Sequence, residues 1–281
     1  MALYYAQSSL TDARAVVIGI PFDRTSSFIP GSRFGPPQIR IGGDNVESYS
    51  PYQSRDLTSL KIHDAGDLFF PDATWPGVVQ TIRQRLSQHF ASGKLPISLG
   101  GEHSITGPIV AAAHEYHPNL AVIHFDAHAD LRPEFLNESY SHATAMHRAA
   151  AVVGPDRIFQ FGIRSGTEAE FRIGRHLYPF SVLAPLRTAK SQFQAQPLYV
   201  TIDVDVLDPG VMPAVATPEP GGISYVELLH ALLELRDCQI VGIDIVEYNP
   251  LANRDLASAS LVAALLREAI LVACPAAGSK P

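Results

Sequence analysis

Residues 120–130 read LAVIHFDAHAD, an apolar run that ends abruptly in a group of ionisable side chains. A continuously apolar run of this length is typical of a strand buried on both faces of a parallel sheet. In parallel α/β folds, ligands bind at the carboxyl ends of the strands. Asp126, His128 and Asp130 therefore stand where such a fold places its functional residues.

Short apolar runs of this kind alternate with amphipathic helical patterns along the whole chain. Strands are predicted at residues 15–20, 60–63, 96–99, 120–126, 158–162, 198–203 and 239–245. Helices are predicted at residues 78–89, 105–117, 143–153, 225–236 and 255–272. This alternation predicts an α/β fold with a central, mostly parallel sheet and helices on both faces. A closed barrel of eight strand–helix units is the alternative, because it would show the same alternation.

The composition is that of a globular protein with a substantial core. Of the 281 residues, 46% are hydrophobic and 17% are charged. The chain has no internal repeat or linker-like segment, so we predict a single domain over residues 1–281 with a catalytic core at about 15–272. The net charge of −7, without a run of Lys or Arg, argues against nucleic-acid binding and suits a small cationic substrate.

Several features of the sequence point to the cytoplasm. Two cysteines, Cys238 and Cys274, are too few for a disulfide framework and fit a reducing compartment. The first residues, MALYYAQSSLTDAR, lack the basic and apolar regions of a signal peptide. No apolar stretch approaches the length of about 20 residues that spans a bilayer. We therefore expect a cytoplasmic protein without a membrane partner, and a frayed tail after Ala273.

Two further strand ends carry ionisable side chains. These are Glu102 and His103 in ISLGGEHS, and Asp203 and Asp205 in YVTIDVDVLDPG. Side chains two residues apart on an extended strand point to the same side. Asp203 and Asp205 should therefore converge, and so should Asp126 and His128. Asp130 lies where the strand has turned into a loop.

The charges of these motifs indicate a metal site. The set contains four carboxylates, Asp126, Asp130, Asp203 and Asp205, and two imidazoles, His103 and His128. Carboxylates packed together without cations would repel one another and take up protons. Two divalent ions would neutralise them, and a mixed carboxylate and imidazole set without thiolates suits Mn²⁺. Gly100 and Gly101 would allow the sharp turn that brings His103 to the ions.

Each motif alone also has an ordinary structural interpretation. An isolated Asp-x-Asp pair is most often a solvated turn, and a lone histidine after a strand is more often structural than a ligand. Three ionisable groups directly after a buried apolar run have no such ordinary use. Three such motifs at three strand ends together favour a functional metal site.

The motifs resemble the three signatures of the ureohydrolases, the family of arginases, agmatinases and relatives. The resembling segments are GGEHS, FDAHAD and TIDVDVLDPG. Residues 21–40, PFDRTSSFIPGSRFGPPQIR, resemble the N-terminal loop of agmatinases, and SYSPYQSRDL, LRPEF, YSHATAMHRAA and FGIRSG resemble bacterial agmatinases. The resemblance extends from about residue 16 to residue 271. It implies a three-layer α/β/α fold, two Mn²⁺ ions per chain and a homo-oligomer, often a trimer or hexamer.

The resemblance also implies how the ions are held. The first ion would take His103, Asp126, Asp130 and Asp203. The second would take His128, Asp126, Asp203 and Asp205, so that Asp126 and Asp203 bridge the two. With both ions bound, water of lowered pKa would attack a guanidinium carbon.

Further residues match the family by motif. Glu247, in GIDIVEYNP, resembles the glutamate that pairs with the substrate guanidinium, which a carboxylate matches bidentately. His142, in YSHAT, resembles the histidine near the leaving group, although a histidine beside the helix-capping residue Ser141 is the plainer interpretation. Asp130 would orient the nucleophile, and Thr217 would lie in the substrate loop. Asp244, three residues before Glu247, is interpreted as structural.

The resemblance implies hydrolysis of a guanidino compound, with agmatine giving putrescine and urea as the first choice. The stretch LRPEF after the Asp-x-His-x-Asp motif is similar to that of agmatinases and lacks the asparagine-containing loop of arginases. Guanidinobutyrate and arginine remain alternatives, and Arg132 could bind a carboxylate. Two departures from the family pattern are Ala129, where threonine is usual, and Ala214-Val215-Ala216, where a Gly-Thr-Gly stretch is usual.

Two interpretations from other classes stay open at this point. A single-zinc deacetylase-like amidohydrolase would share the fold and an Asp-x-His pair, although one metal would not need both His103 and Asp205. A catalytically weak scaffold would keep the fold without turnover, although every expected ligand is present.

Overall fold

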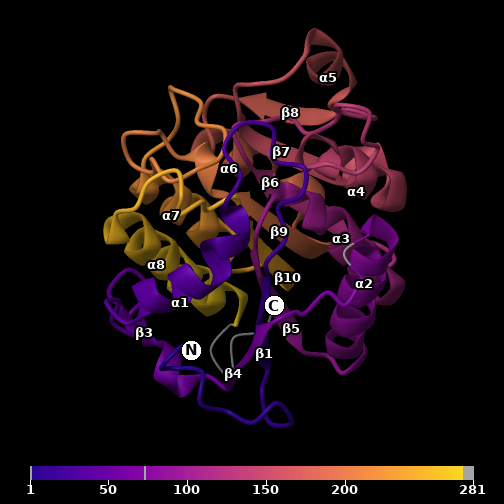
Figure 1. Ribbon diagram of the computed structural model, residues 1–281. Coiled ribbons are helices and arrows are strands. Elements are labelled where there is room, and N and C mark those ends of the chain that lie inside the picture. The colour runs from indigo at the N-terminus through magenta and orange to yellow at the C-terminus, as the bar shows by residue number, and fades with distance from the viewer. Residues whose placement is uncertain (1, 73, 275–281) are drawn as a thin grey trace.

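An eight-stranded parallel sheet forms the centre of the protein, seen in a computed structural model that describes residues 2–72 and 74–274 (Figure 1). The strand order is β4-β1-β5-β10-β9-β6-β7-β8. The strands are β1 (Ala15–Ile20), β4 (Ile62–Asp67), β5 (Leu95–Gly100), β6 (Ala121–Phe125), β7 (Ile158–Ile163), β8 (His176–Pro179), β9 (Pro197–Asp203) and β10 (Gln239–Val246). A short hairpin, β2 (Tyr49–Ser50) and β3 (Arg55–Asp56), is antiparallel.

Helices cover both faces of this sheet, so the molecule has three layers. The helices are α1 (Gly35–Gly43), α2 (Trp75–Ala91), α3 (Thr106–Tyr116), α4 (Ala145–Val153), α5 (Glu168–Ile173), α6 (Leu183–Phe193), α7 (Tyr225–Glu234) and α8 (Leu256–Ala273). In Figure 1, α1, α7 and α8 lie on one side of the sheet and α2, α3 and α4 on the other. The sheet is open, with β4 and β8 at its edges, so the predicted three-layer fold is confirmed and the barrel is excluded.

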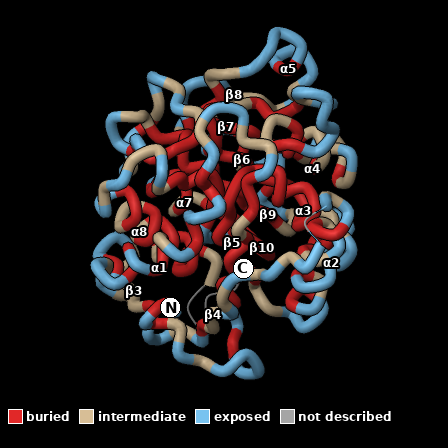
Figure 2. Tube along the Cα trace, in the orientation of Figure 1, coloured by how far each residue is buried: buried red, intermediate tan, exposed pale blue. Residues whose placement is uncertain are grey.

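The central strands could be predicted from the sequence because they are buried. Every residue of β1, β6 and β7 is buried, as expected for strands covered by helices on both faces. Figure 2 shows this as a continuous buried band through the middle of the molecule, with exposed loops around it. The prediction of buried, continuously apolar strands is therefore confirmed.

The sequence missed elements at the edges of the fold. Strand β8 and helices α5 and α6 were not predicted, and α1 begins at Gly35, inside the segment 21–40 that was interpreted as a loop, and continues to Gly43. Strand β4 begins two residues later than predicted and continues through the polar stretch IHDAGD. In β4 only Ile62 is buried, and in α6 only Leu186, Ala189 and Phe193 are. The sequence of β4 therefore contains no apolar run that would predict its full length. Helix α6 does bury residues at helical spacing, and the sequence reasoning overlooked that pattern.

Helix α8 corrects one expectation. It has 18 residues and is, in the described part of the chain, the one helix long and apolar enough to span a bilayer by length and composition. It packs against α1 and β10, and 61% of it is buried. That burial is typical of the core helix of a folded domain. The helix ends at Ala273, and the tail expected to fray, residues 275–281, lies outside the described residues.

A buried ion pair joins α1 to the edge strand β4. The Arg40 guanidinium donates from Nε and Nη2 to the two Asp64 oxygens at 2.8 and 2.9 Å, and from Nη1 to Asp67 at 2.5 Å. Burial alone would raise the pKa of Asp64, but the Arg40 hydrogen bonds and charge outweigh burial and lower it. The pair is therefore ionised in the folded protein at neutral pH.

Replacing Arg40 by Met should lower the free energy of unfolding by about 3–5 kcal/mol at pH 7, because it leaves a buried carboxylate without its partner. Since the folded pKa of Asp64 lies below its ordinary value of 3.8, this contribution is present above about pH 4 and is lost as the pH falls further. Urea unfolding of both proteins between pH 7 and pH 3 measures it. The exposed pair Arg187–Glu234 provides the control, Arg187→Met, with an expected change below about 1 kcal/mol. Equal stabilities of wild type and R40M at pH 7 would contradict this reading.

Candidate metal centre and active site

Strand register brings the predicted motifs together. Strands β5, β10, β9 and β6 are neighbours in the centre of the sheet. Ile245 pairs with Leu99, Val246 with Asp203, and Phe125 with Ile202. The residues that follow these pairs therefore emerge at one level from four adjacent strands. All three metal motifs and Glu247 consequently lie at the same edge of the sheet.

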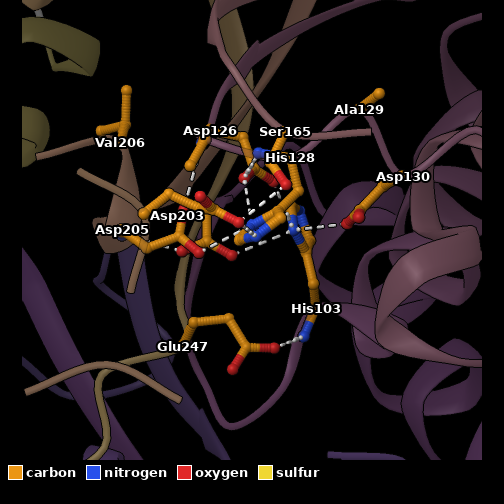
Figure 3. A network of polar contacts seen from close by, with 12 residues as sticks. His103, Asp126, His128, Ala129, Asp130, Ser165, Asp203, Asp205, Val206 and Glu247 are labelled. Atoms are coloured by element: carbon orange, nitrogen blue, oxygen red, sulfur yellow. Dashed lines mark hydrogen bonds and ion pairs between the residues drawn. The ribbon is translucent and has the colours of Figure 1, made fainter. Parts of the chain in front are cut away.

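One group of side chains surrounds His103. Its Nδ1 atom lies 3.1 Å from Asp126 Oδ2, 3.2 Å from Asp130 Oδ2 and 3.4 Å from Asp203 Oδ2. All four residues are buried. Three carboxylates around one imidazole nitrogen form the set that the sequence predicted for a first ion (Figure 3).

A second group surrounds His128. Its Nδ1 atom lies 2.9 Å from Asp205 Oδ2 and 3.5 Å from Asp126 Oδ1. Asp126 thus presents Oδ2 to His103 and Oδ1 to His128, and it belongs to both groups that could hold a metal ion. If two ions were bound, Asp126 would be placed to contact both. Asp203 contacts the first group through Oδ2, while its Oδ1 accepts a hydrogen bond from the Asp205 N–H at 2.9 Å.

The side chains converge by a different local geometry from the one predicted. Strand β9 ends at Asp203, and Asp205 lies in a 3₁₀ turn, Val204–Val206. Strand β6 ends at Phe125, and the His128 N–H donates to Asp126 Oδ1 at 2.6 Å in the loop beyond it. Turns after the strands, rather than extended alternation, therefore gather these residues.

The two glycines before His103 also act differently from the prediction. Among the described residues neither Gly100 nor Gly101 has a positive φ, so the turn itself does not require glycine. A Cβ on Gly101 would lie 2.0 Å from the Phe22 carbonyl oxygen. Glycine is required here because the backbone at Phe22 passes so close that it leaves no room for a side chain, and not because the turn needs conformational freedom.

The donor atoms fit a pair of divalent ions. His103 Nδ1 and Asp205 Oδ2 are buried polar atoms without a hydrogen-bond partner among the described residues. The Thr201 hydroxyl lies 2.5 Å from Asp244 Oδ1 and donates its hydrogen there, so His103 Nε2, at 2.9 Å, must donate to Thr201. Nδ1 then keeps a lone pair directed at the carboxylates, as a metal-ligating histidine does. Asp244 therefore supports His103 from behind, in keeping with its structural interpretation.

The pKa shifts within the cluster also indicate that it needs positive charge. Burial lowers the pKa of His103 and of His128, but the facing carboxylates outweigh burial and raise both well above the usual value. Burial raises the pKa of Asp203 and of Asp205, and the neighbouring carboxylates add to the rise. So many acids in one buried place need positive charge, and only protons or cations can supply it. Two divalent ions would satisfy all of them at neutral pH.

His124 is a site residue that the sequence reasoning missed. Its Nε2 lies 2.7 Å from Asp126 Oδ2, and Gln160 Nε2 lies 3.0 Å from its Nδ1 and 2.6 Å from the Ala129 carbonyl. Because the Gln160 amide donates to that carbonyl and to Nδ1, Nε2 carries the hydrogen and donates to Asp126. His124 belongs to the first group of residues that could hold an ion, but with this hydrogen on Nε2 it orients the Asp126 carboxylate instead of ligating through that atom. The signal was present, since strand alternation places His124 on the same side as Asp126.

Asp130 and Glu247 share an unusual backbone. Both have a positive φ, 54° and 66°, which residues with a Cβ rarely adopt. Such strain persists where the surrounding structure imposes it, and it gathers at functional sites. Glu247 is 5% exposed and its Oε1 accepts the His103 N–H at 2.7 Å. Burial, followed by the nearby Glu102, raises the pKa of Glu247 well above the usual value, and a guanidinium placed beside it would oppose this rise by stabilising the carboxylate.

A cleft of about 210 Å³ opens beside the cluster. Its lining includes His128, Asp130, His142, Thr217 and Glu219. Both His142 and Thr217, predicted near the substrate, are thus in its wall. Of the departures from the family pattern, Ala214, Val215 and Ala216 are buried, whereas Ala129 is part of the cleft lining and points away from the cluster in Figure 3.

Comparison with known proteins decides the family. The chain matches the arginase family over residues 13–272. The chain belongs to the arginase family. It is 39% identical to the agmatinase of Bacillus subtilis (strain 168), with 92% of each chain covered. It is 34% identical to an N(1)-aminopropylagmatine ureohydrolase of Thermus thermophilus, with 85% of this chain and 84% of that protein covered.

Solved structures of arginase-family members agree. The agmatine ureohydrolase of Thermoplasma volcanium superposes with a TM-score of 0.88 at 32% identity, covering 97% of this chain and 94% of that one. The resemblance inferred from the motifs is therefore confirmed, and this arginase-family chain is a ureohydrolase with a buried cluster of the binuclear type. The deacetylase-like alternative is no longer needed. Substrates of the arginase family are guanidino compounds.

Proposed function

We propose that this ureohydrolase converts agmatine and water to putrescine and urea, with two Mn²⁺ ions per chain. Relatives named for agmatine and for aminopropylagmatine both match most of the chain, which supports a substrate that contains the agmatine unit. The observation that carries the choice of agmatine is the charge of the cleft beside the cluster, described below.

The ligand sets proposed for the ions follow the two groups. His103, Asp126, Asp130 and Asp203 would hold the first ion, and His128, Asp126 and Asp205 the second. Asp203 is added to the second set because the family resemblance implies it. Oxygen-rich sets with one imidazole each suit Mn²⁺. When bound, the two ions lower the pKa of water and so provide the nucleophile at neutral pH.

The chain's own residues supply position and proton transfer. Asp130, beside His103, would accept a hydrogen bond from the attacking water and orient it. Glu247 would hold the guanidinium by charge-assisted hydrogen bonds, which turns a bimolecular attack into a positioned one. His142 lines the cleft, and burial lowers its pKa, so it is neutral near pH 7 and can accept a proton. It would pass that proton to the departing amine.

The cleft favours a substrate whose far end is positive. Glu219 is 36% exposed, and its Oε1 accepts the Ser165 hydroxyl at 2.8 Å, while Oε2 has no partner among the described residues. Arg132, the cation in the cleft wall, donates from Nε to the buried Glu170 at 3.2 Å, and its guanidinium lies 4.8 Å above the Phe135 ring. Its charge is balanced by Glu170, although its Nη atoms have no partner among the described residues. An ammonium group would therefore find the free Glu219 oxygen, whereas a carboxylate tail would meet an arginine that Glu170 already neutralises.

A substrate panel tests the proposal. Agmatine, N1-aminopropylagmatine, 4-guanidinobutyrate and arginine are compared for urea release by the Mn²⁺-loaded protein. We expect kcat/KM for agmatine to exceed the values for guanidinobutyrate and arginine by at least about tenfold, equivalent to 1.4 kcal/mol. A higher value for any other member of the panel would reassign the substrate. No urea from any of them, with two metals bound, would refute a urea-forming activity on these compounds.

Replacing Glu219 by Gln should raise the KM for agmatine about tenfold, because it removes the charge that faces the ammonium end. Butylguanidine has the same chain without the ammonium, so its KM should change less than about twofold. Steady-state urea release with both substrates measures the difference. Glu168→Gln, on the surface at 79% exposure, is the matched control. An equal rise in KM for both substrates would show that Glu219 does not interact with the ammonium group of agmatine.

A further inference from the structure

The segment between β1 and α1 crosses the wall of the cleft and carries an anchored threonine. The Thr25 N–H donates to Glu102 Oε2 and the Thr25 hydroxyl to Glu102 Oε1, both at 2.7 Å. Glu102 is fully buried and also accepts the Ser104 hydroxyl at 2.6 Å. The Thr25 backbone N–H can only donate, and the Thr25 and Ser104 hydroxyls donate beside it. Burial raises the pKa of Glu102, and these three hydrogen bonds to its oxygens oppose that rise. Thr25 is therefore held at two points.

The anchored hydroxyl determines what else Thr25 can bind. A hydroxyl has one hydrogen, and Thr25 gives it to Glu102, so every other partner must donate to its oxygen. The partners are the backbone N–H of His142 at 3.0 Å and His142 Nδ1 at 3.3 Å. It follows that Nδ1 carries the hydrogen of the neutral imidazole and donates it to Thr25.

The other nitrogen is then the basic one. His142 Nε2 lies 3.2 Å from the Ser27 hydroxyl, which can donate to its lone pair. Both Ser27 and His142 line the cleft together with Asp130. The ring also meets Phe135 edge to face, with centroids 5.6 Å apart, which holds its plane. Nε2 is thus the nitrogen available to a reacting group.

We propose that Thr25, anchored by Glu102, is a positioning residue that fixes His142 as the Nδ1–H tautomer, leaving Nε2 as the only atom through which its proton moves. This inference rests on the proposed function, in which His142 passes a proton to the leaving amine. As the water oxygen bonds to the guanidinium carbon, one of its O–H bonds breaks and that proton forms an N–H bond at Nε2. The proton then passes to the departing nitrogen as the C–N bond breaks, which returns His142 to its starting form. The second water proton leaves the oxygen as the C=O bond of urea forms and ends on the amine, which departs as an ammonium ion. Hydrogen bonds from Nδ1 to Thr25 and on to Glu102 support the positive ring in between.

Thr25→Val tests the proposal, because it keeps the shape of the side chain and removes the hydroxyl. We expect kcat for agmatine to fall about 10- to 100-fold, part of the contribution that a placed acid–base group makes, with KM within about twofold. Thr25→Ser keeps the hydroxyl and should restore kcat to within about threefold of wild type. Ser26→Ala removes a neighbouring buried hydroxyl that has no partner among the described residues, and it should leave kcat unchanged.

A spectroscopic reading separates this inference from the proposed function. In protein labelled with ¹⁵N-histidine and loaded with diamagnetic Mg²⁺, the His142 signals, assigned by loss in His142→Asn, should show a protonated Nδ1 in wild type and T25S. In T25V the population should shift toward protonated Nε2. The Nδ1–H form without any urea release would support the tautomer and refute the function. A wild-type kcat in T25V, or a protonated Nε2 in wild type, would overturn the inference while leaving the ureohydrolase assignment intact.

Discussion

Asp126→Asn should reduce urea formation by a factor on the order of a thousand or more, equivalent to about 4 kcal/mol of transition-state stabilisation. Asp126 is the one side chain shared by both groups that could hold a metal among the described residues, with one oxygen toward His103 and the other toward His128. An amide has one acceptor oxygen and cannot bridge as a carboxylate does. The variant should therefore lose metal as well as activity.

Metal content by elemental analysis, together with urea release, measures this first prediction. We expect fewer than two Mn²⁺ per chain in D126N after dialysis, against two in wild type. Asp237→Asn changes an exposed aspartate far from the cluster and should alter neither quantity. Two tightly bound ions in D126N with wild-type turnover would show that Asp126 is not the bridging ligand.

Glu247→Gln should reduce kcat/KM by a factor of about 30 to 5,000, equivalent to the 2–5 kcal/mol lost when one member of a buried charge pair is removed. The substitution keeps an oxygen that can accept the His103 N–H, at 2.7 Å in the wild type, so the backbone of the metal loop should remain in place. What it removes is the negative charge that would face the guanidinium.

The contrast with Asp126 makes this second prediction specific. E247Q should retain two Mn²⁺ per chain and the thermal stability of wild type, and it should lose only turnover. Metal analysis and a thermal melt accompany the kinetic assay. Loss of metal in E247Q would assign Glu247 to support of the cluster. An undiminished kcat/KM would show that Glu247 has no part in the reaction.

The centre of the fold was predictable because burial and sequence pattern coincide there. Strands such as β6 are covered on both faces, and their apolar runs end where the sheet ends. Residue types that bind metals come directly after the apolar run, so the stretch LAVIHFDAHAD predicts both the strand and three candidate site residues. The edge strand β8 has no buried residue and therefore no such pattern, whereas α6 buries Leu186, Ala189 and Phe193 at a helical spacing that was overlooked.

The rest of the site depends on contacts that pattern alone does not encode. Thr25 reaches His142 across 117 positions in the chain, and Glu102 reaches Thr25 across 77. No local spacing predicts pairings of this kind, because tertiary packing brings the segments together. His124 is a different case. Alternation along β6 would have placed it beside Asp126, but a histidine inside an apolar run was read only as part of the strand.

The central claim is that two ions, held by two groups sharing Asp126, are needed for urea formation. Metal-free protein is titrated with Mn²⁺, and bound metal and urea release from agmatine are measured at each step. The account predicts that turnover rises as the second equivalent binds and reaches its maximum at two ions per chain. Full turnover at one ion per chain, or no urea at two, would contradict it.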